Sequence, residues 1–433
     1  LFERARARAA TLRARGVDPG DVVALRIRDV RLTLEWTLGV LFAGAVLAPF
    51  NPDAPIYEYS YLETLVVPVV VVAEGLYVSA GNLSVIDACA PSGQLPRIDP
   101  VPRSPDDGAL IFFTSGTTGR PKAVLVRQGA LAANLAALQM AWEWSQDDTL
   151  CLTLPLFHMH GLGIGLLGSL WTGGSLYLRA GFDASFVLEA AAQRRASMLF
   201  GVPTMYHKLA DAGGRDALSS LRLIVSGSAP LSKELHEAMR TASGSYPLER
   251  YGMSETAMLT SNPLRGIRKP GSVGFELPGV RLRLADGDAG EILVKGPNVF
   301  REYLENPIAT ADAFVDGWFR TGDIGRFDED GYLSIVGRAK ELIITGGYNV
   351  YPREVEEVIT LVPGVREAAV VGEPSPKWGE IVVAYVVGTA DPGTIATACS
   401  SQLSPYKCPR EIRFIDAVPR NHMGKIQRHL LRA

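Results

Sequence analysis

A short polar segment between two apolar runs is the part of the chain best suited to bind a phosphate group. Residues 114–122 read Thr-Ser-Gly-Thr-Thr-Gly-Arg-Pro-Lys, and this order predicts a strand, a loop and a second strand. The glycines let the loop turn its N–H groups toward one point, the hydroxyls add donors, and Lys122 adds a positive charge. We therefore predict a phosphate-binding loop made of Thr114, Ser115, Gly116, Thr117, Thr118, Gly119 and Lys122.

The spacing of this loop differs from that of a Walker loop. Gly116 and Gly119 are separated by two residues, and Lys122 follows a proline and is not followed by Ser or Thr. A flexible hairpin turn that binds nothing is the alternative interpretation, because loops rich in Thr, Ser and Gly are common. The later segments of the chain have to decide between the two.

A second candidate for nucleotide chemistry lies at residues 249–256, which read Glu-Arg-Tyr-Gly-Met-Ser-Glu-Thr. The ring of Tyr251 is suited to stacking on a purine. The carboxylate of Glu255 is suited to holding Mg²⁺ against phosphates, because hard cations prefer oxygen ligands. The alternative is a solvated loop in which Glu255 caps a helix.

Two histidines, His158 and His160, flank Met159 and suggest a metal pair. Side chains at positions i and i+2 do not lie on one face of a helix, and no third ligand clusters nearby in the sequence. We therefore expect these histidines to line a substrate channel or to lie in the core.

Composition indicates a protein that acts on small molecules. The 433 residues carry a formal net charge of −3, so no strong field attracts nucleic acid or an anionic membrane. The four cysteines lack metal spacing, which fits a reducing compartment, and we expect a cytoplasmic protein. The most apolar segment, residues 38–50, is too short to span a bilayer. The basic run at residues 4–15 fits a surface helix better than a targeting peptide, because it is rich in alanine and amphipathic.

The order of the expected elements predicts an α/β fold. Helices alternate with short apolar strands over residues 1–100, which is typical of a parallel sheet covered on both faces. We predict a large N-terminal domain over residues 1–337, with parallel-rich sheets covered by helices and a small β subdomain. A small α+β domain is predicted over residues 338–433, with a helix at 352–360.

Several segments, taken together and in this order, resemble the motifs of the adenylate-forming superfamily of acyl-CoA synthetases, adenylation domains and luciferases. They are residues 114–122, 226–231, 249–256, 318–323, 337–344 and 419–426, and the resemblance extends from about residue 111 to the end. It implies that ATP or AMP is bound by the loop above and by Ser228, Ala229, Pro230, Arg250, Tyr251, Gly252, Met253, Ser254, Asp323 and Arg338.

The resemblance also implies individual roles. The backbone of Ala229 and Pro230 would pack on adenine. Asp323 would accept both ribose hydroxyls, with Arg338 as a second ribose contact. Read without the resemblance, Asp323 is an ordinary turn aspartate.

The C-terminal part of the chain resembles the mobile lid of the family. Lys425 is implied as the lysine that bridges the carboxylate and the α-phosphate, and Lys340 as the hinge. Gly346 and Gly347 would line the CoA tunnel after the small domain rotates. His158 would act as a gate between the nucleotide and acyl pockets.

The implied reaction has two halves. A carboxylic acid and MgATP give an acyl-adenylate and pyrophosphate, and the thiol of coenzyme A then displaces AMP. Lys425, Glu255 and His158 are the expected catalytic residues, and Glu255 is the expected ligand of Mg²⁺.

Within the superfamily, segments such as Pro-Leu-Phe-His-Met-His-Gly-Leu resemble malonyl-CoA synthetases. The resemblance implies that Arg268 pairs with the distal carboxylate of malonate, although a surface arginine is the alternative. It also implies a small acyl pocket lined by Met159, Met258 and Ser226. Differences from the expected residues beside Met258 make malonate or a 2-substituted malonate the predicted acid.

Other functions remain open at this stage. The chain also fits a general short- or medium-chain acyl-CoA synthetase, an adenylation enzyme that loads a carrier protein, or a catalytically silent nucleotide-binding regulator. Asp183 resembles the aspartate that binds an α-amino group in amino-acid-adenylating domains, but His158 already occupies the place of that motif. We expect Asp183 to cap a helix that begins at Ala184.

Overall fold

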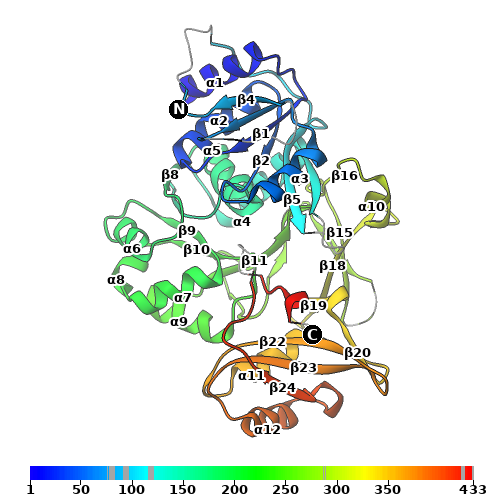
Figure 1. Cartoon of the computed structure of the whole chain (residues 1–433). Helices are drawn as coiled ribbons and strands as arrows, with labels where there is room; N and C mark the ends of the chain where they lie inside the picture. Colours follow the sequence, from blue (N-terminus) through cyan, green and yellow to red (C-terminus); the bar gives the residue numbers. More distant parts are fainter. Residues whose placement is uncertain are drawn as a thin grey trace.

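The computed structural model describes residues 1–75, 77, 83–90, 97–115, 121–285, 287, 289–420 and 425–431. Within these residues it has two sheets of seven strands and two of five. Three sheets form a large unit, and the fourth belongs to a smaller unit at the end of the chain (Figure 1). This arrangement confirms the expected fold class, with a large parallel-rich α/β part, a small β subdomain and a small α+β part.

The first sheet is parallel in its centre and antiparallel at one edge. Its strands are β16 (Glu302–Tyr303), β6 (Pro121–Arg127), β5 (Gly108–Ser115), β2 (Val46–Pro49), β1 (Val22–Arg26), β3 (Val70–Ala73) and β4 (Ser84–Asp87). Its helices are α1 (Phe2–Ala14), α2 (Val30–Phe42) and α3 (Ile56–Val66). Val23 packs in the same core as Trp36 of α2, and Ala24 packs in the core that contains Leu62 of α3. The alternation of β1 side chains thus places helices on both faces of the sheet.

The second sheet repeats this design. Its order is β13 (Phe275–Glu276), β12 (Ala257–Ser261), β11 (Leu248–Met253), β10 (Leu223–Ser226), β9 (Met198–Gly201), β7 (Thr149–Leu152) and β8 (Ser175–Leu178), of which the last five are parallel. Its helices are α4 (Gln128–Trp142), η1 (Met159–Leu166), α5 (Leu167–Thr172), α6 (Ala184–Ala192), α7 (Pro203–Ala212), α8 (Arg215–Leu218) and α9 (Lys233–Ser243). The buried Trp142 meets the ring of Phe200 edge-on and donates a hydrogen bond to Ser261, so α4 contacts both β9 and β12 of this sheet.

Two smaller sheets complete the chain. The β subdomain contains β14 (Arg281–Leu284), β15 (Ala289–Lys295), β17 (Phe314–Val315), β18 (Trp318–Phe327) and β19 (Leu333–Arg338), with α10 (Pro307–Asp312) beside it. The small unit contains β20 (Ile343–Thr345), β21 (Tyr348–Val350), β22 (Val365–Ser375), β23 (Gly379–Gly388) and β24 (Glu411–Phe414). Its helical segments are α11 (Pro352–Thr360), α12 (Pro392–Gln402) and the short turns η2 (Ala339–Glu341), η3 (Pro405–Lys407) and η4 (Arg428–Leu430).

Local chemistry sets several helix boundaries. The carboxylate of Asp29 accepts hydrogen bonds from the first backbone amides of α2. Asp183 accepts from the amide of Phe186 at the start of α6, which confirms the predicted cap. Helix α4 ends at Trp142 because Glu143 is left-handed, with φ at 48°.

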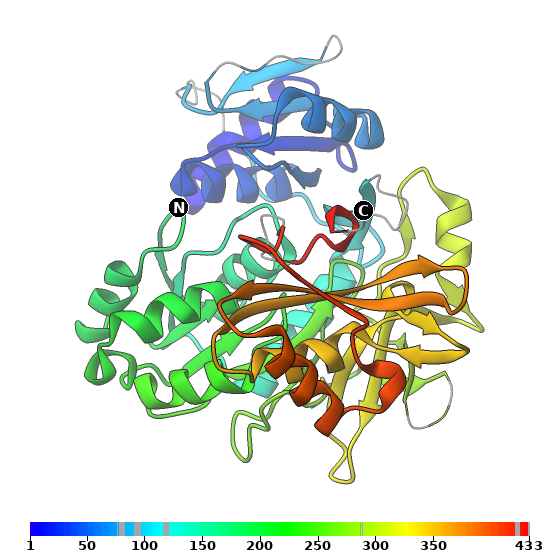
Figure 2. The same cartoon turned by 60° about the horizontal axis from the view of Figure 1, so that its bottom comes forward.

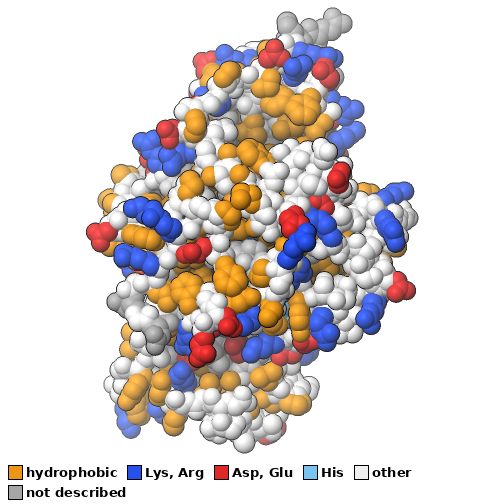
Figure 3. Space-filling view, turned by 180° about the vertical axis from the view of Figure 1, so that it is seen from behind, with side chains coloured by type: hydrophobic (Ala, Val, Ile, Leu, Met, Phe, Trp, Pro, Cys, Tyr) orange, Lys and Arg blue, Asp and Glu red, His pale blue; other side chains and the backbone are white. Residues whose placement is uncertain are grey.

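Among the described residues, no helix is long and apolar enough to cross a bilayer. On the rear face, apolar side chains form several separate groups with charged residues between them (Figure 3). Such scattered apolar residues are normal on protein surfaces.

Candidate active site

The predicted motifs meet where the parallel strands β9, β10 and β11 end. A nucleotide site is expected there, at the carboxyl edge of a parallel sheet. The hairpin of β5 and β6 and the strand pair β18 and β19 lie next to this edge (Figure 1). The last described segment, drawn in red, runs back from the small unit over the large unit toward the same place (Figures 1 and 2).

The expected strand, loop and strand around residues 114–122 are present as β5 and β6. Thr114 and Lys122 are paired across the hairpin, so the loop begins and ends at one point. Gly116, Thr117, Thr118 and Gly119 lie outside the described residues, as does the side chain of Ser115. The Lys122 ammonium lies 4.4 Å from the ring centroid of Tyr303.

Asp323 is held by two protein partners. The hydroxyl of Tyr251 donates to its Oδ2 at 2.6 Å, and Nε of Arg338 lies 3.1 Å from its Oδ1. Burial, followed by the charge of Asp323, raises the pKa of Tyr251 well above its ordinary value, so the phenol stays protonated and donates. A carboxylate offers about four lone-pair positions, which leaves acceptor capacity on Asp323 for a diol.

Glu255 is buried, and one of its carboxylate oxygens accepts a hydrogen bond from a side chain. The hydroxyl of Tyr303 donates to its Oε1 at 3.0 Å, and burial raises the pKa of the carboxyl group. Among the described residues, no group of three or more His, Cys, Asp or Glu side chains is placed to hold a metal ion. A metal at Glu255 therefore needs phosphate and water oxygens as its other ligands, which is how Mg²⁺ is usually bound beside ATP.

Lys425 reaches this cluster from the small unit. Its surroundings lower the pKa of the amine, first by desolvation and then by the charge of Arg338, while Asp323 and Glu255 act in the opposite direction. Three residues later, Arg428 forms an ion pair with Glu341 and donates to the carbonyl of Val370. The segment that carries the lysine is therefore attached to the small unit.

A second polar cluster lies around Arg250, which is only 4% exposed. Its Nε and Nη2 have no hydrogen-bond partner within the described part of the chain. The guanidinium lies directly against Gly227, where an added Cβ would fall 2.3 Å from Cζ. Burial lowers the pKa of Arg250 to about 10, so the side chain is still a cation at neutral pH.

Neutral polar groups surround this cation. His160 is 4% exposed, and its Nδ1 lies 3.4 Å from the hydroxyl of Ser228. Burial and the charge of Arg250 hold the pKa of His160 well below its usual range, so the ring is neutral. The buried hydroxyl of Ser226 has no partner among the described residues. The cluster can accept an anion without first breaking an existing ion pair.

Arg250 and Tyr251 separate the two clusters. They are consecutive in β11, and successive strand residues point to opposite faces. Tyr251 faces Asp323, whereas Arg250 faces Gly227. The sequence had assigned Arg250 to the nucleotide, and its neighbours in the structure are those of the second cluster.

The structure does not bring Arg268 to either cluster. Its guanidinium donates to the carbonyls of Tyr246 at 2.6 Å and Leu264 at 3.2 Å. Tyr246 precedes β11, whereas the clusters lie where β11 ends, which separates the two positions by roughly 15 Å at about 3.3 Å per strand residue.

The expected methionines of the acyl pocket lie in the core, and the expected gate histidine lies beside a helical turn. Met159 and Met258 are buried in the main core, and the backbone of Met258 is bonded in both directions by the amide of Asn134. His158 immediately precedes the π-helix η1, which contains Met159 and His160 and which the sequence had not indicated. Such irregular turns occur frequently at functional sites.

The expected hinge and tunnel residues surround the link between the units. Lys340 lies in η2, between the last strand of the β subdomain and the first strand of the small unit. Gly346 and Gly347 form an exposed turn with φ values of 59° and 84°. Nη1 of Arg353 donates to the carbonyl of Ile335 across this link.

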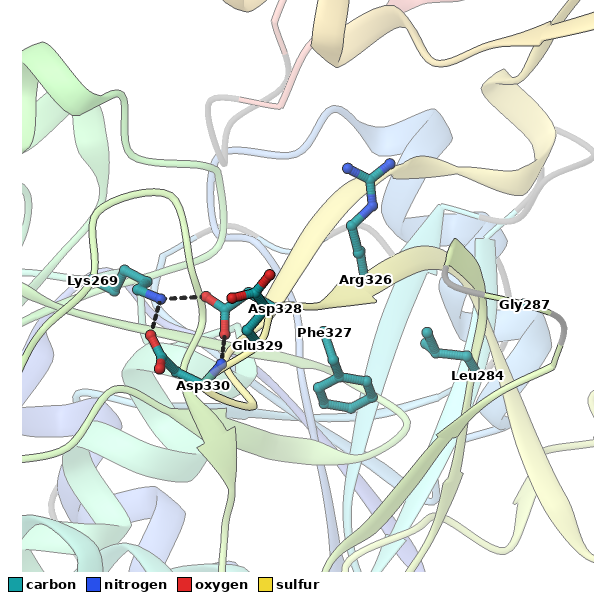
Figure 4. A pocket seen from close by; sticks show the side chains of 8 residues that line it. All are labelled: Lys269, Leu284, Gly287, Arg326, Phe327, Asp328, Glu329 and Asp330. Atoms are coloured by element: carbon teal, nitrogen blue, oxygen red, sulfur yellow. Dashed lines mark hydrogen bonds and ion pairs between the residues drawn. The ribbon is translucent and has the colours of Figure 1, made fainter.

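A separate open pocket lies at the turn between β18 and β19 (Figure 4). Lys269 donates there to Asp328 and Asp330, and Arg326 points away from them. Lys269 is thus already paired with two carboxylates, and none of the predicted nucleotide residues lines the pocket.

The comparison with known families decides the class of enzyme. The AMP-binding enzyme family matches residues 1–304, and the AMP-binding enzyme C-terminal domain matches residues 354–425. The chain belongs to the AMP-binding enzyme family. It is an AMP-forming acid–thiol ligase whose substrates are ATP, CoA and a small-molecule acid.

Curated relatives of this family act on several acids. A feruloyl-CoA synthase from an Amycolatopsis species is 36% identical and aligns with 96% of this chain and 89% of its own length. A sulfoacetate–CoA ligase from Cupriavidus necator is 36% identical over 96% of this chain and 88% of its own. A mitochondrial malonate–CoA ligase from Mus musculus is 38% identical over 75% of this chain and 64% of its own.

Solved structures confirm the resemblance to malonyl-CoA synthetases. ATP-bound MatB from Rhodopseudomonas palustris gives a TM-score of 0.94 at 38% identity, covering 99% of this chain and 92% of that one. A malonyl-CoA ligase with methylmalonyl-CoA and AMP bound gives 0.71 at 41% identity, covering 96% and 93%. At similar identity and coverage, the structure is thus more similar overall to the ATP-bound relative.

Two features of the site had no clear sequence signal. His160 was expected only to line a substrate channel or to lie in the core, and Tyr303 belongs to no recognised motif. Their roles depend on contacts between strands and segments that are far apart in the sequence.

Proposed function

We propose that this enzyme activates malonate or a 2-substituted malonate, forms the acyl-adenylate and transfers the acyl group to CoA. The observation that carries the proposal is the buried guanidinium of Arg250, two of whose nitrogens have no partner among the described residues. A buried charge without a partner is costly, and an anionic ligand group removes that cost. A guanidinium fits a carboxylate in bidentate fashion, so the distal carboxylate of a dicarboxylic acid suits this position.

The neighbours of Arg250 support a small, polar acid. His160 is neutral and Ser226 keeps its hydroxyl free of other partners among the described residues, so both can donate to or accept from the ligand. Met159 and Met258 bring apolar surface from the core. A methyl group at carbon 2 fits such a surface better than a second charge does.

The two clusters would divide the first half-reaction between them. Arg250 would anchor the distal carboxylate, which leaves the other carboxylate to face the α-phosphate. Tyr251, Asp323 and Arg338 would hold the adenosine, and Lys122 the outer phosphates. Lys425 would stabilise the negative charge that grows as the carboxylate attacks phosphorus and pyrophosphate leaves.

Glu255 is the residue that would hold Mg²⁺. The ion would neutralise charge on the phosphate oxygens. For the second half-reaction, the small unit would have to turn about η2, which withdraws Lys425 and brings Gly346 and Gly347 toward the site. Attack of the CoA thiol on the acyl carbon would then release AMP.

The test is ATP-dependent formation of CoA thioesters, scored by mass spectrometry, on malonate, methylmalonate, succinate, butyrate and benzoate in parallel. We expect malonate or methylmalonate to be preferred over butyrate. Arg250→Met should lower kcat/KM for malonate by at least about a hundredfold, because the ligand charge is then buried without a partner. The same variant should improve butyrate relative to malonate while ATP binding is retained.

Arg268→Met is the matched control, because it removes the same type of side chain from the arginine that the sequence favoured. Malonate kinetics should be unchanged in this variant. Loss of malonate use in Arg268→Met, with normal kinetics in Arg250→Met, would move the acid anchor to Arg268. Equal turnover of butyrate and malonate by the parent enzyme would favour a general short-chain synthetase.

Sulfoacetate is a second candidate acid, because its sulfonate presents the same pair of oxygens to a guanidinium and a sulfoacetate–CoA ligase is among the relatives. Adding it to the acid panel distinguishes the two. Adenylate formation without a CoA thioester would instead point to another thiol acceptor, such as a carrier protein.

A further inference from the structure

Tyr303 lies in the two-residue strand β16, which pairs antiparallel with β6 at the edge of the first sheet. The register places Tyr303 opposite Val124, two residues after Lys122. Side chains at i and i+2 of a strand point to the same face, so Tyr303 lies on the face from which Lys122 projects. The side chain is only 7% exposed.

Two functional groups contact this side chain at once. Its hydroxyl donates to Oε1 of Glu255 at 3.0 Å, and its ring centroid lies 4.4 Å from Nζ of Lys122. The hydroxyl thus contacts one of the two oxygens of the carboxylate. An ammonium at this distance from an aromatic face is attracted by the ring.

The surroundings fix Tyr303 itself. Its backbone amide donates to the hydroxyl of Thr310 at 3.0 Å, and its ring packs edge-on against Phe300 at 4.8 Å. The amide of Phe300 donates to the backbone carbonyl of Glu255 at 2.7 Å. The tyrosine and the carboxylate are therefore held by the same short segment.

We propose that Tyr303 is a positioning residue for MgATP, which holds the carboxylate of Glu255 toward the metal and the ammonium of Lys122 toward the phosphates. The inference rests on the proposed roles of Glu255 and Lys122 and is independent of which acid is used. Side chains that orient a metal ligand commonly affect metal affinity about 10- to 100-fold.

The two contacts can be separated by calorimetry. The affinity of the full chain for an α,β-methylene ATP analogue is measured with and without Mg²⁺, in the absence of any acid or CoA. Tyr303→Phe removes the hydroxyl and keeps the ring, so the gain in affinity on adding Mg²⁺ should fall about tenfold. The affinity without Mg²⁺ should be unchanged.

Tyr303→Leu removes the ring as well. This variant should also lose about two- to fivefold in affinity without Mg²⁺, since Lys122 is released from the aromatic face. In a Glu255→Gln background, Tyr303→Phe should have no further effect on the Mg²⁺-dependent gain. Additive losses in that double variant would contradict the link between Tyr303 and Glu255.

Tyr332 provides a matched control outside the site. It is 8% exposed, its hydroxyl donates to the carbonyl of Ile267 at 2.8 Å, and Lys269 lies 4.8 Å over its ring. Tyr332→Phe should bind the analogue like the parent under both conditions. An unchanged Mg²⁺-dependent gain in Tyr303→Phe, or an equal loss with and without Mg²⁺, would overturn the proposal. Failure of the acid panel would not affect this test, because no acid is present.

Discussion

Two arginines show how differently the two halves of this active site are built. Arg338 is paired with Asp323, whose other oxygen accepts the hydroxyl of Tyr251. Arg250 is almost completely buried and keeps two nitrogens without a partner among the described residues. Asp323 on the proposed nucleotide side thus has protein partners before any ligand binds, whereas the proposed acid side would be completed by its ligand.

This difference indicates where specificity lies. A site whose buried polar groups depend on the ligand rejects analogues that leave those groups unpaired. A preassembled site gains affinity from rigidity, and losing one of its internal bonds leaves the others in place. We therefore expect substitutions to have larger effects on the acid side than equivalent substitutions beside the ribose.

The largest effect is expected at Lys425, which the proposed mechanism uses during adenylation. Lys425→Ala should slow acyl-adenylate formation by about 10² to 10³, the usual cost of losing one contact to transition-state charge. Transfer of the acyl group from a supplied acyl-adenylate to CoA should be nearly unaffected, because in the proposed mechanism the lysine leaves with the small unit. Pyrophosphate release and thioester formation measure the two halves separately, and equal losses in both would contradict this division of roles.

A pair of Arg→Lys substitutions tests the comparison between the proposed nucleotide side and the proposed acid side directly. Arg250→Lys keeps the charge but loses the planar fork, and we expect kcat/KM for malonate to fall roughly 10- to 100-fold. Arg338→Lys keeps an ion pair with Asp323 and should raise KM for ATP only about two- to tenfold.

Steady-state kinetics with each substrate varied in turn gives both values. A larger kinetic loss in Arg338→Lys than in Arg250→Lys would contradict the comparison, because the nucleotide side would then be the half that is more sensitive to substitution. Thermal unfolding of both variants provides the control for general destabilisation.

Sequence reasoning reached the nucleotide side more easily than the acid side, for a physical reason. Tyr251 and Glu255 lie in one segment, so residue types and spacing indicated their chemistry. The acid cluster combines His160, Ser226 and Arg250 from three segments that meet only when β10 and β11 pair. A linear pattern could not show that Arg268 donates to backbone carbonyls, whereas two nitrogens of Arg250 have no partner among the described residues.

Secondary structure was likewise predictable where the signal lies within one segment, and not where it depends on contacts between distant segments. The helix predicted at 352–360 is α11, because proline and an amphipathic pattern mark it locally. Helix α4 stops at Trp142, and Trp144 packs in the core beside Phe200, a contact between distant segments that no local pattern indicates. Tyr303 gave no signal at all, because its contacts depend on the pairing of β16 with β6.

Tyr251→Phe should have a smaller effect than Arg250→Lys and an effect similar to that of Arg338→Lys. It removes the hydrogen bond to Asp323 but leaves Arg338 in place, so KM for ATP should rise about two- to tenfold with little change in kcat. Malonate KM should be unchanged. A large loss of kcat in this variant would mean that Asp323 depends on the phenol for more than orientation.

The smallest effect concerns acid pH and the neutral ring of His160. Burial and Arg250 lower its pKa in the folded state, whereas the unfolded chain binds the proton near pH 6.5, so the unfolded state holds more protons below that pH. Stability should therefore fall as the pH drops below about 6.5, with a contribution of up to about 1.4 kcal/mol per pH unit from this residue. His160→Asn should remove that slope in denaturant unfolding.

The exposed His207 provides the control, and His207→Asn should leave the pH dependence of unfolding as it is in the parent. Saturating malonate should protect the folded state more strongly at low pH if its carboxylate offsets the charge of Arg250 next to the imidazole. An unchanged acid slope in His160→Asn would show that the ring is charged in the folded enzyme. The acid side would then hold two cations in place of one, and its ligand would have to supply more negative charge than a single distal carboxylate.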